Sequence, residues 1–463
     1  MPHLPLLPPP GTDTAPARPK GRGPLLLGLS LGYFMVLLDT TVVTVALPAI
    51  GADLSGSRGG LQWVSNGYTL AFAALLLTAG ALSDRYGDRR VFLTGLWLFA
   101  VLSALSAAAG STGVLIALRV LLGAAGALLL PASLAIVARV HTDPAARARA
   151  MGAWAAITGT ALAAGPLAGG VLTDAFGWRS VFLLNVPVAL VGLVLTTRYA
   201  PSGPPGPAKG LDPLGQCTAA LALTGLAYAL VESGPAGWWS PRVLAGGAVF
   251  AVAGALFVYA ERRPESEAYA PMLPLSLFRA RTLSAGLVAG LLANFGLSGV
   301  LFVLSLSFQQ ERGHTAFATG LAFLPLTLPT AFNPVLTGRL VARVGARGPA
   351  LAGFLMMGAG TLVPAVTTSP VPTGAGLALL GFGVSFALPP LMTAVLGAAP
   401  AHRTGTASGA LNASRQTGAT LGVAVLGALP TPTALLTAAL ALLTAAAVAA
   451  AFLESPARGR KHL

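Results

Sequence analysis

The feature that constrains this chain most is a series of apolar stretches, each long enough to cross a lipid bilayer as a helix. A membrane-spanning helix needs about 20 mostly apolar residues. Apolar side chains make up 55% of the 463 residues and charged ones only 9%, which is not the composition of soluble domains. We count fourteen such stretches, at 24–48, 61–83, 91–110, 112–138, 150–173, 180–197, 211–231, 243–260, 283–308, 317–337, 348–367, 372–396, 406–428 and 432–453. The sequence therefore predicts an all-α integral membrane protein with 14 transmembrane helices.

The positive charges are distributed in a way that sets the orientation of these helices. The formal net charge is +14, which could also suggest a nucleic-acid partner. If residue 1 lies in the cytoplasm, 22 of the 28 Lys and Arg residues fall in cytoplasmic segments, 4 in external loops and 2 inside helices. That distribution follows the positive-inside rule. We therefore expect no nucleic acid as a partner, and both termini in the cytoplasm.

A short repeat divides the chain into two halves. "GALSDRYGDRR" follows the second stretch at 80–90, and "GRLVARVGARG" follows the tenth at 338–348. The first copy aligns Gly80, Leu82, Arg85, Gly87 and Arg89 with Gly338, Leu340, Arg343, Gly345 and Arg347 of the second. Paired six-helix units are typical of secondary transporters, whose substrate site lies near the midplane between the halves. The alternative is a coincidence of Gly and Arg in two short turns.

The repeat predicts the domain organisation. Residues 1–23 are expected to form a disordered cytoplasmic tail and 24–197 a first six-helix bundle. Residues 198–282 form a linker with two inserted helices, 283–453 a second six-helix bundle and 454–463 a second cytoplasmic tail. The first apolar stretch is too long for the core of a signal peptide, so we expect it to be retained.

Several motifs together resemble one family. They are "LDTTVVTVALP", "GALSDRYGDRR", "RVLLGAAGA", "GTALAAGPLAGG", "GWRSVFLLNVP" and "GTASGALNASRQTGATLG". In this combination and order, over nearly the whole chain after the tail, they resemble the major facilitator superfamily, specifically its fourteen-helix drug:H⁺ antiporter branch of multidrug and quaternary-ammonium exporters. Ser83 and Asp88 depart from the usual loop motif.

Asp39 is the only acidic residue well inside an apolar stretch. A carboxylate at such depth costs roughly 2.5 to 3.5 kcal/mol on insertion scales, so an intramembrane acid is a functional hypothesis by default. At 1.5 Å per residue, Asp39 lies about 14 Å and Arg119 about 10 Å below the outer ends of their stretches, so the two can pair. We predict a proton-coupling pair. The alternatives are a permanently hydrogen-bonded structural acid, and an Arg119 that extends to the membrane interface.

Two motifs add expectations about gating and direction. In the stretch 150–173, Pro166 kinks the helix, and Gly159, Gly165, Gly169 and Gly170 let a neighbour pack closely. The resemblance implies that this motif marks exporters. It also implies that Asp84, in the loop motif that contains Gly80, Arg85, Gly87 and Arg89, closes the cytoplasmic gate against the second half. The alternative is an ordinary solvated basic loop.

Arg415 is the second intramembrane cation, and it has two interpretations. It can bind an anionic group, or it can tie neighbouring helices together. The other candidates for the substrate cavity are polar or aromatic residues inside apolar stretches, most of which are individually equally consistent with packing or lipid contact. They are Tyr33, Gln62, Asn66, Tyr68, Trp154, Asn294, Phe295, Phe302, Asn333, Phe386 and Asn412.

The sequence thus predicts a proton-coupled antiporter that exports lipophilic small molecules from a bacterial cell by alternating access. We expect no cofactor and no metal, with the proton motive force as the energy source, and a monomer in the lipid bilayer as the functional unit. The alternative is a proton symporter that imports a nutrient. A channel, a receptor or an enzyme is disfavoured, because no selectivity filter, signalling domain, metal cluster, nucleophile elbow or phosphate loop is recognisable.

Overall fold

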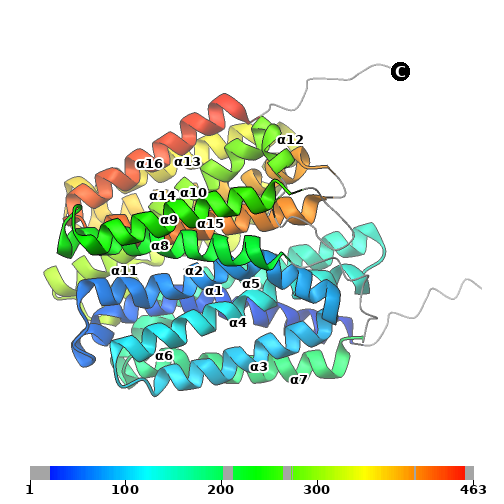
Figure 1. Cartoon of the computed structure of the whole chain (residues 1–463), viewed down its shortest axis with the longest axis horizontal. Coiled ribbons are helices and arrows are strands. Elements are labelled where there is room, and N and C mark those ends of the chain that lie inside the picture. The colour runs from blue at the N-terminus through cyan, green and yellow to red at the C-terminus, as the bar shows by residue number, and fades with distance from the viewer. Residues whose placement is uncertain (1–20, 202–211, 264–272, 274, 401–402, 454–463) are drawn as a thin grey trace, which may run out of the picture.

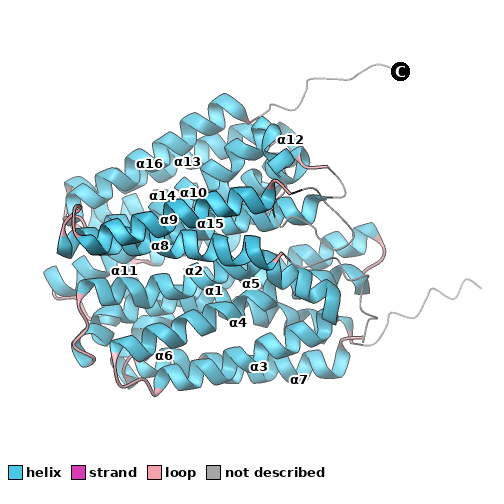
Figure 2. Ribbon diagram, viewed as in Figure 1, coloured by secondary structure: helices cyan, strands magenta, loops and turns pink. Residues whose placement is uncertain are grey.

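The structure is a computed structural model that describes residues 21–201, 212–263, 273, 275–400 and 403–453. Within these residues the secondary structure consists of helices joined by short turns, with no strand (Figure 2). Both predicted tails lie largely or wholly outside the described residues; only the end of the first, which leads into α1 at Arg22, is described.

The first half of the chain folds into seven helical segments. They are α1 (Arg22–Asp53), α2 (Arg58–Tyr86), α3 (Asp88–Ala107), α4 (Thr112–Val140), α5 (Pro144–Phe176), α6 (Arg179–Leu183) and α7 (Asn185–Tyr199). Three of them begin at a residue whose side chain accepts a hydrogen bond from a free backbone N–H of the first turn: Ser57, Ser111 and Asp143.

The rest of the chain adds two helices and then a second group. The two are α8 (Pro213–Ala236) and α9 (Pro241–Glu261). The second group contains α10 (Arg281–Leu306), α11 (Ala316–Ala322), α12 (Leu324–Val344), α13 (Arg347–Val366), α14 (Pro370–Ala398), α15 (Thr404–Gly427) and α16 (Thr431–Phe452). A short 3₁₀ helix (Leu275–Arg279) precedes α10, and a π-helical turn (Ser307–Glu311) follows it.

Each predicted apolar stretch overlaps one helix or one broken pair of helices. In the described part of the chain, 11 helices are long and apolar enough to cross a membrane, or up to 13 if each bent pair is one span. The helix α15, which carries Asn412 and Arg415, is not among them. The all-helical membrane fold is confirmed, whereas the number of fourteen spans stays a prediction.

The two groups of helices lie side by side with α8 and α9 across their junction (Figure 1). Helix α8 contacts α2 of the first group and α15 of the second, and α9 packs on α8. Gln216 of α8 donates to the carbonyl of Ala74 and accepts from the hydroxyl of Thr78, where the two arms of α2 meet at 54°. The inserted helix therefore supplies polar partners at a bend in α2, as polar groups within a bilayer require.

The aligned glycines of the repeat play the same structural part. Gly87 ends α2 with φ +89° and Gly345 ends α12 with φ +81°, backbone conformations that glycine adopts without strain. The N–H of Gly87 donates to Ser83 O at 2.9 Å, and that of Gly345 to Val341 O at 2.8 Å. The two turns of the repeat are thus equivalent in the fold, whereas the domain boundaries given above stay a prediction.

The two ends of the bundle differ in charge. The end that holds the turns 84–90 and 343–347 is rich in arginine, and we call it the basic end. The other end, with the turns 54–57 and 108–111, is called the opposite end. One apolar core includes Val45, Leu47 and Ile50 of α1 near the opposite end and continues into the second group through Val300 and Leu426. The two groups are therefore joined by apolar packing toward the opposite end.

Candidate functional site

Asp39 and Arg119 form an ion pair inside the first group of helices. Asp39 is 2% exposed and Arg119 1% exposed, and the guanidinium Nη1 donates to Asp39 Oδ2. Asp39 lies on α1 and Arg119 on α4, so the pair joins two helices of the same half. The structure brings these two predicted residues together, and it excludes an Arg119 side chain that extends to the membrane interface.

The guanidinium of Arg119 is held on two further sides. Its Nε donates to the carbonyl oxygen of Val64 on α2 at 3.0 Å. Its Cζ lies 4.4 Å from the centre of the Tyr68 ring and 6.0 Å from that of Phe182, in the range of cation–π contacts. Tyr68 is itself fixed, because its hydroxyl donates to Val36 O at 3.2 Å. These contacts hold Arg119 in place independently of the state of Asp39.

The second oxygen of Asp39 has a partner that the sequence did not suggest. Asn185 Nδ2 donates to Asp39 Oδ1 at 3.1 Å and to Ser103 Oγ at 3.0 Å, and Ser103 donates to the carbonyl of Phe182 at 2.8 Å. Asn185 lies at the break between α6 and α7. The only signal in the sequence was one polar residue within the apolar run "VFLLNVP". The carboxyl group thus accepts hydrogen bonds on both oxygens, from α4 and from the start of α7.

The glycines of the α5 motif lie where helices come closest. A Cβ at Gly165 would lie 1.8 Å from Thr41 Oγ1, and one at Gly169 would lie 2.8 Å from Val42 O, both on α1. A Cβ at Gly170 would lie 2.5 Å from Ala316 O of α11. Gly159 has open space around it. The motif therefore packs α5 against its own half through Gly165 and Gly169, and against the other half through Gly170.

Helix α11 returns the contact, and a carboxylate completes it. A Cβ at Gly320 would lie 2.5 Å from Pro166 O. Asp174, at the end of α5, accepts from the backbone N–H groups of Ala316 at 3.1 Å and Phe317 at 2.8 Å. Asp174 was not among the predicted site residues. It joins the two halves beside the motif.

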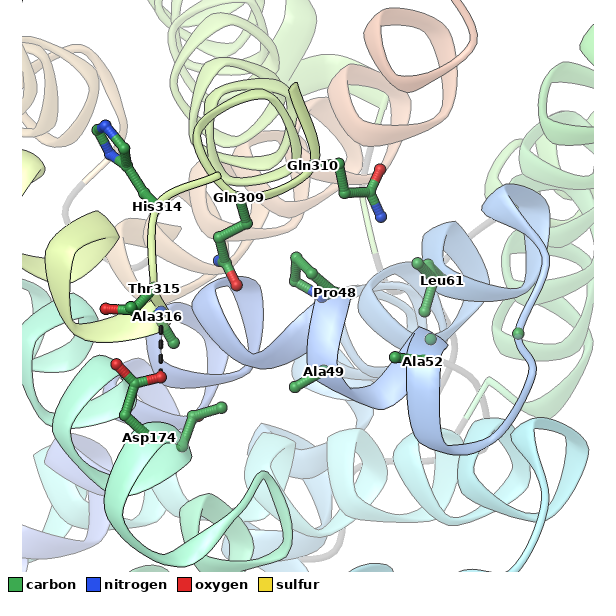
Figure 3. A pocket seen from close by; sticks show the side chains of 13 residues that line it. Pro48, Ala49, Ala52, Leu61, Asp174, Gln309, Gln310, His314, Thr315 and Ala316 are labelled. Carbon is green, nitrogen blue, oxygen red and sulfur yellow. Dashed lines mark hydrogen bonds between the residues drawn. The ribbon is translucent and has the colours of Figure 1, made fainter. Parts of the chain in front are cut away.

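A cavity of about 680 Å³ opens next to this junction at the opposite end. Figure 3 shows Asp174, Gln309 and His314 around it, with Pro48 and Ala49 of α1 on the other side. Gln309 Nε2 donates to Val45 O of α1 at 2.9 Å, which is another bond between the halves. The cavity is lined by polar side chains and by backbone from both halves.

Helices α2 and α15 are also joined toward the opposite end. Gln62 donates to the carbonyls of Val423 and Ala424, each at 3.1 Å. The hydroxyls of Thr69 and Thr420 are 3.0 Å apart. The halves are therefore held together at this end by α2 with α15, α5 with α11, and α1 with α10.

The loop motif at the basic end contains one exposed acid and one buried acid. Asp84 is exposed and has no hydrogen bond or ion pair to another described residue. The buried acid is Asp88, which accepts from Ser83 Oγ at 2.7 Å and pairs with Arg139. The two departures from the motif thus bind one another, and they brace α2, α3 and α4. The gate role of Asp84 stays a prediction.

The remaining loop and cavity candidates fall into distinct environments. Arg89 donates to Thr197 O at 2.8 Å, and Arg85 lies over the Tyr86 ring. Five of the cavity candidates are almost completely enclosed: Gln62, Asn66, Tyr68, Phe302 and Asn333. The side-chain amide of Asn66 has no hydrogen-bond partner in the described residues. Trp154 and Asn294 are each 9% exposed. Five are partly exposed: Tyr33, Phe295, Phe386, Asn412 and Arg415.

Comparison with known proteins places this arrangement in a family. The Major Facilitator Superfamily model matches residues 29–423 and 331–462. The chain is 37% identical to the multidrug resistance protein Stp of Mycobacterium tuberculosis over 87% of this chain and 74% of that one. It is 37% identical to the methylenomycin A resistance protein of Bacillus subtilis, over 87% and 86%. It is also 36% identical to the tetracenomycin C resistance and export protein of Streptomyces glaucescens, over 88% and 75%.

Solved structures agree on the fold. A crystal structure of the peptide transporter POT matches with a TM-score of 0.68 over 92% of this chain and 93% of that one, at 17% identity. The human organic anion transporter MFSD10 matches with a TM-score of 0.65 over 93% and 100%, at 19% identity. The chain belongs to the major facilitator superfamily. It is therefore a membrane transporter and not an enzyme, as the sequence predicted.

Proposed function

We propose that this protein exports lipophilic small molecules, antibiotics or other drugs among them, in exchange for protons. The Asp39–Arg119 pair carries the proposal, since it is a carboxyl group held inside the membrane domain next to a fixed cation. Its relatives support the class of substrate, because they are multidrug and antibiotic resistance proteins. The α5 motif, packed between the halves, supports export.

The proposed cycle uses Asp39 as the proton carrier. While charged, Asp39 draws α1 toward α4 through Arg119 and toward the α6–α7 break through Asn185. Protonation removes the charge that Arg119 faces, so it weakens the link between these helices. Helix α1 also packs against Gly165 and Gly169, through its backbone and the side chain of Thr41. A shift of α1 therefore reaches the junction of α5 with the other half.

The contacts between the halves indicate which side of the cycle this conformation represents. The bonds from Gln62, Asp174 and Gln309 close the opposite end. We infer that the basic end faces the cytoplasm, with both termini on that side, and that this is an inward-facing state of a bacterial cell-membrane protein. A monomer contains both halves of the site, so we infer that one chain is sufficient.

The proton gradient is strong enough for this work. One proton that moves inward through about 100 mV releases roughly 2.3 kcal/mol. Because 1.36 kcal/mol corresponds to a factor of ten, that supports about a fifty-fold gradient of a neutral substrate. The proposal needs no cofactor.

The test is transport in oriented vesicles that contain only this protein. With an imposed proton gradient, the wild type is expected to drive a lipophilic drug outward against its own gradient, and a protonophore is expected to stop it. Accumulation of substrate in the direction of proton flow would instead establish the alternative, a symporter. A drug-sensitive strain that expresses the chain, grown with and without a protonophore, identifies the substrates to use.

A further inference from the structure

The second intramembrane arginine has surroundings that the proposed proton pathway does not use. The aliphatic part of Arg415 on α15 packs beside Gly290 of α10, where a Cβ would come within 3.2 Å of Arg415 Cγ and 2.8 Å of Leu411 Cδ1. Its Nε donates to Asn294 Oδ1 at 3.3 Å. A glycine therefore makes room for this side chain, and one neutral oxygen accepts from it.

No described carboxylate neutralises this charge. The ion pairs of the described residues involve Arg119, Arg139, Arg179 and Arg242, but not Arg415. Asp39, the acid at comparable depth, is engaged by Arg119 and Asn185. A guanidinium has five N–H donors, and a charge removed from bulk water is costly unless it is paired. Arg415 thus keeps most of its hydrogen-bonding capacity for another group.

The opposite wall is aromatic and belongs to the other half. Tyr33 of α1 lies near enough to Arg415 for an electrostatic interaction between the two halves. Both side chains are partly exposed. Trp154 of α5 stacks on Tyr33 with ring centres 5.3 Å apart and planes 8° apart. The indole Nε1 is buried and has no acceptor in the described part of the chain.

These features share one chemical preference. A guanidinium binds a carboxylate through two parallel hydrogen bonds, and an indole N–H is a donor only. The stacked rings of Tyr33 and Trp154 offer a flat apolar surface for an aromatic body. A ligand that suits both Arg415 and the stacked rings has an acidic group attached to a planar apolar body, whereas a cation would be repelled by Arg415.

We propose that Arg415, Tyr33 and Trp154 form a substrate subsite that selects amphipathic organic acids, with Arg415 as the anion-binding group. This inference rests on the proposed export function and narrows its substrate class. It assigns the two intramembrane arginines to different tasks: Arg119 serves the proton, and Arg415 serves the substrate.

The test compares three ligands that share a naphthalene body and differ in the charge of the attached group: 2-naphthoate, its methyl ester, and 2-naphthylmethylammonium. Binding is measured on the full chain in nanodiscs of a neutral lipid, so that lipid headgroups supply no net acid. The wild type is expected to bind the acid at least about ten-fold more tightly than the ester, and the ammonium most weakly. Equal binding of acid and ester would overturn the proposal.

Variants then assign the preference to Arg415. Arg415→Gln is expected to weaken acid binding about ten-fold and to leave ester binding within about two-fold, whereas Arg415→Lys keeps part of the acid preference. A parallel loss of acid and ester binding would overturn the assignment. If Arg415→Gln does not fold, Asn294→Asp replaces it, because a carboxylate next to Arg415 is expected to cause the same selective loss of acid binding.

Transport separates this inference from the proposed function. Proton-driven movement of the ester by both wild type and Arg415→Gln, without any acid preference in binding, would support export and refute the subsite. An acid preference that depends on Arg415, in a protein that moves none of the ligands on a proton gradient, would support the subsite and refute proton-coupled export.

Discussion

Arg119 and Arg415 are the same type of residue at similar depth in the two halves, yet their surroundings are opposite. Arg119 is 1% exposed, paired with Asp39, bonded to Val64 O and covered by the Tyr68 ring. Arg415 is partly exposed, has one long bond to Asn294 and faces the other half. The charge of Arg119 is neutralised inside its own half, whereas that of Arg415 has no carboxylate partner among the described residues.

The difference shows how one fold gives two like charges different surroundings. In the first half, α1, α2, α4 and the start of α7 supply the hydrogen bonds of the Asp39–Arg119 pair, so this pair forms without the second half. In the second half, α10 gives Arg415 only Gly290 and the Asn294 oxygen. In alternating access the contacts between the halves change. The surroundings of Arg415 should therefore change more than those of Arg119.

The largest effect is expected from removal of the charge that Arg119 faces. Asp39→Asn keeps the size of the side chain but cannot exchange a proton, so uphill transport driven by a proton gradient should fall to the background level. The measurement is substrate accumulation in vesicles with an imposed pH difference. Asp53→Asn is the matched control, because Asp53 also pairs with an arginine, Arg179, but is exposed at the opposite end. Proton-driven accumulation that persists in Asp39→Asn would show that the pair is structural.

The next largest effect is expected in the free energy of unfolding, which should differ between variants of the two arginines. Arg119→Leu leaves a buried carboxylate without its cation, and such breakage costs about 3–5 kcal/mol. Arg415→Leu removes a charge that has no described carboxylate partner, so the free energy of unfolding should change by less than about 1 kcal/mol. Thermal unfolding of both variants in one detergent provides the comparison.

A double variant sharpens the same prediction. Asp39→Leu with Arg119→Leu replaces the whole pair by apolar groups, which is often neutral for stability. The double variant should therefore be more stable than Arg119→Leu alone, although inactive in transport. Equal destabilisation by Arg119→Leu and Arg415→Leu would remove the distinction between the two sites.

A smaller loss is expected at the second donor to Asp39. Asn185→Leu removes hydrogen bonds to a carboxylate and to Ser103, and a bond to a charged group contributes about 1.5–3 kcal/mol. Asn66→Leu is the matched control, since Asn66 is 0% exposed but has no hydrogen-bond partner among the described residues. Thermal unfolding should show a clear loss for Asn185→Leu and none for Asn66→Leu. A reversed order would mean that the bonds seen here do not stabilise Asp39.

The sequence predicted the parts of this comparison that depend on one chain segment at a time. Apolar length located the helices, and depth along two helices was enough to pair Asp39 with Arg119. The repeat located the equivalent turns at Gly87 and Gly345. What it could not predict depends on contacts between distant segments. Asn185 donates to Asp39, which lies 146 positions away in the sequence, and no periodicity predicts that contact.

The loop motif is a second case in which the sequence did not predict contacts between distant segments. The resemblance directed attention to Asp84, which is exposed, whereas the two departures from the motif, Ser83 and Asp88, form the buried interaction with Arg139. A motif identifies the turn, but the partner of each side chain depends on α4. Likewise, Asp174 was not among the predicted site residues, although it binds the start of α11 in the other half.

The smallest predicted effect tests whether the two arginine sites can be made alike. Asn294→Asp places a carboxylate next to Arg415, in the position of the oxygen that already accepts from its Nε. Because Arg415 is partly exposed, the new pair should stabilise the fold by no more than about 1 kcal/mol. A small rise in the midpoint of thermal unfolding is the expected result.

The control for this variant is Asn333→Asp, which places a carboxylate at a 3% exposed position on α12 where no described cation pairs with the existing side chain. A buried charge without a partner is unfavourable, so this variant should lose stability. If Asn294→Asp loses as much as Asn333→Asp, the guanidinium of Arg415 is already neutralised by another group. The contrast with Arg119 would then lie in the identity of the partner, and not in whether a partner exists.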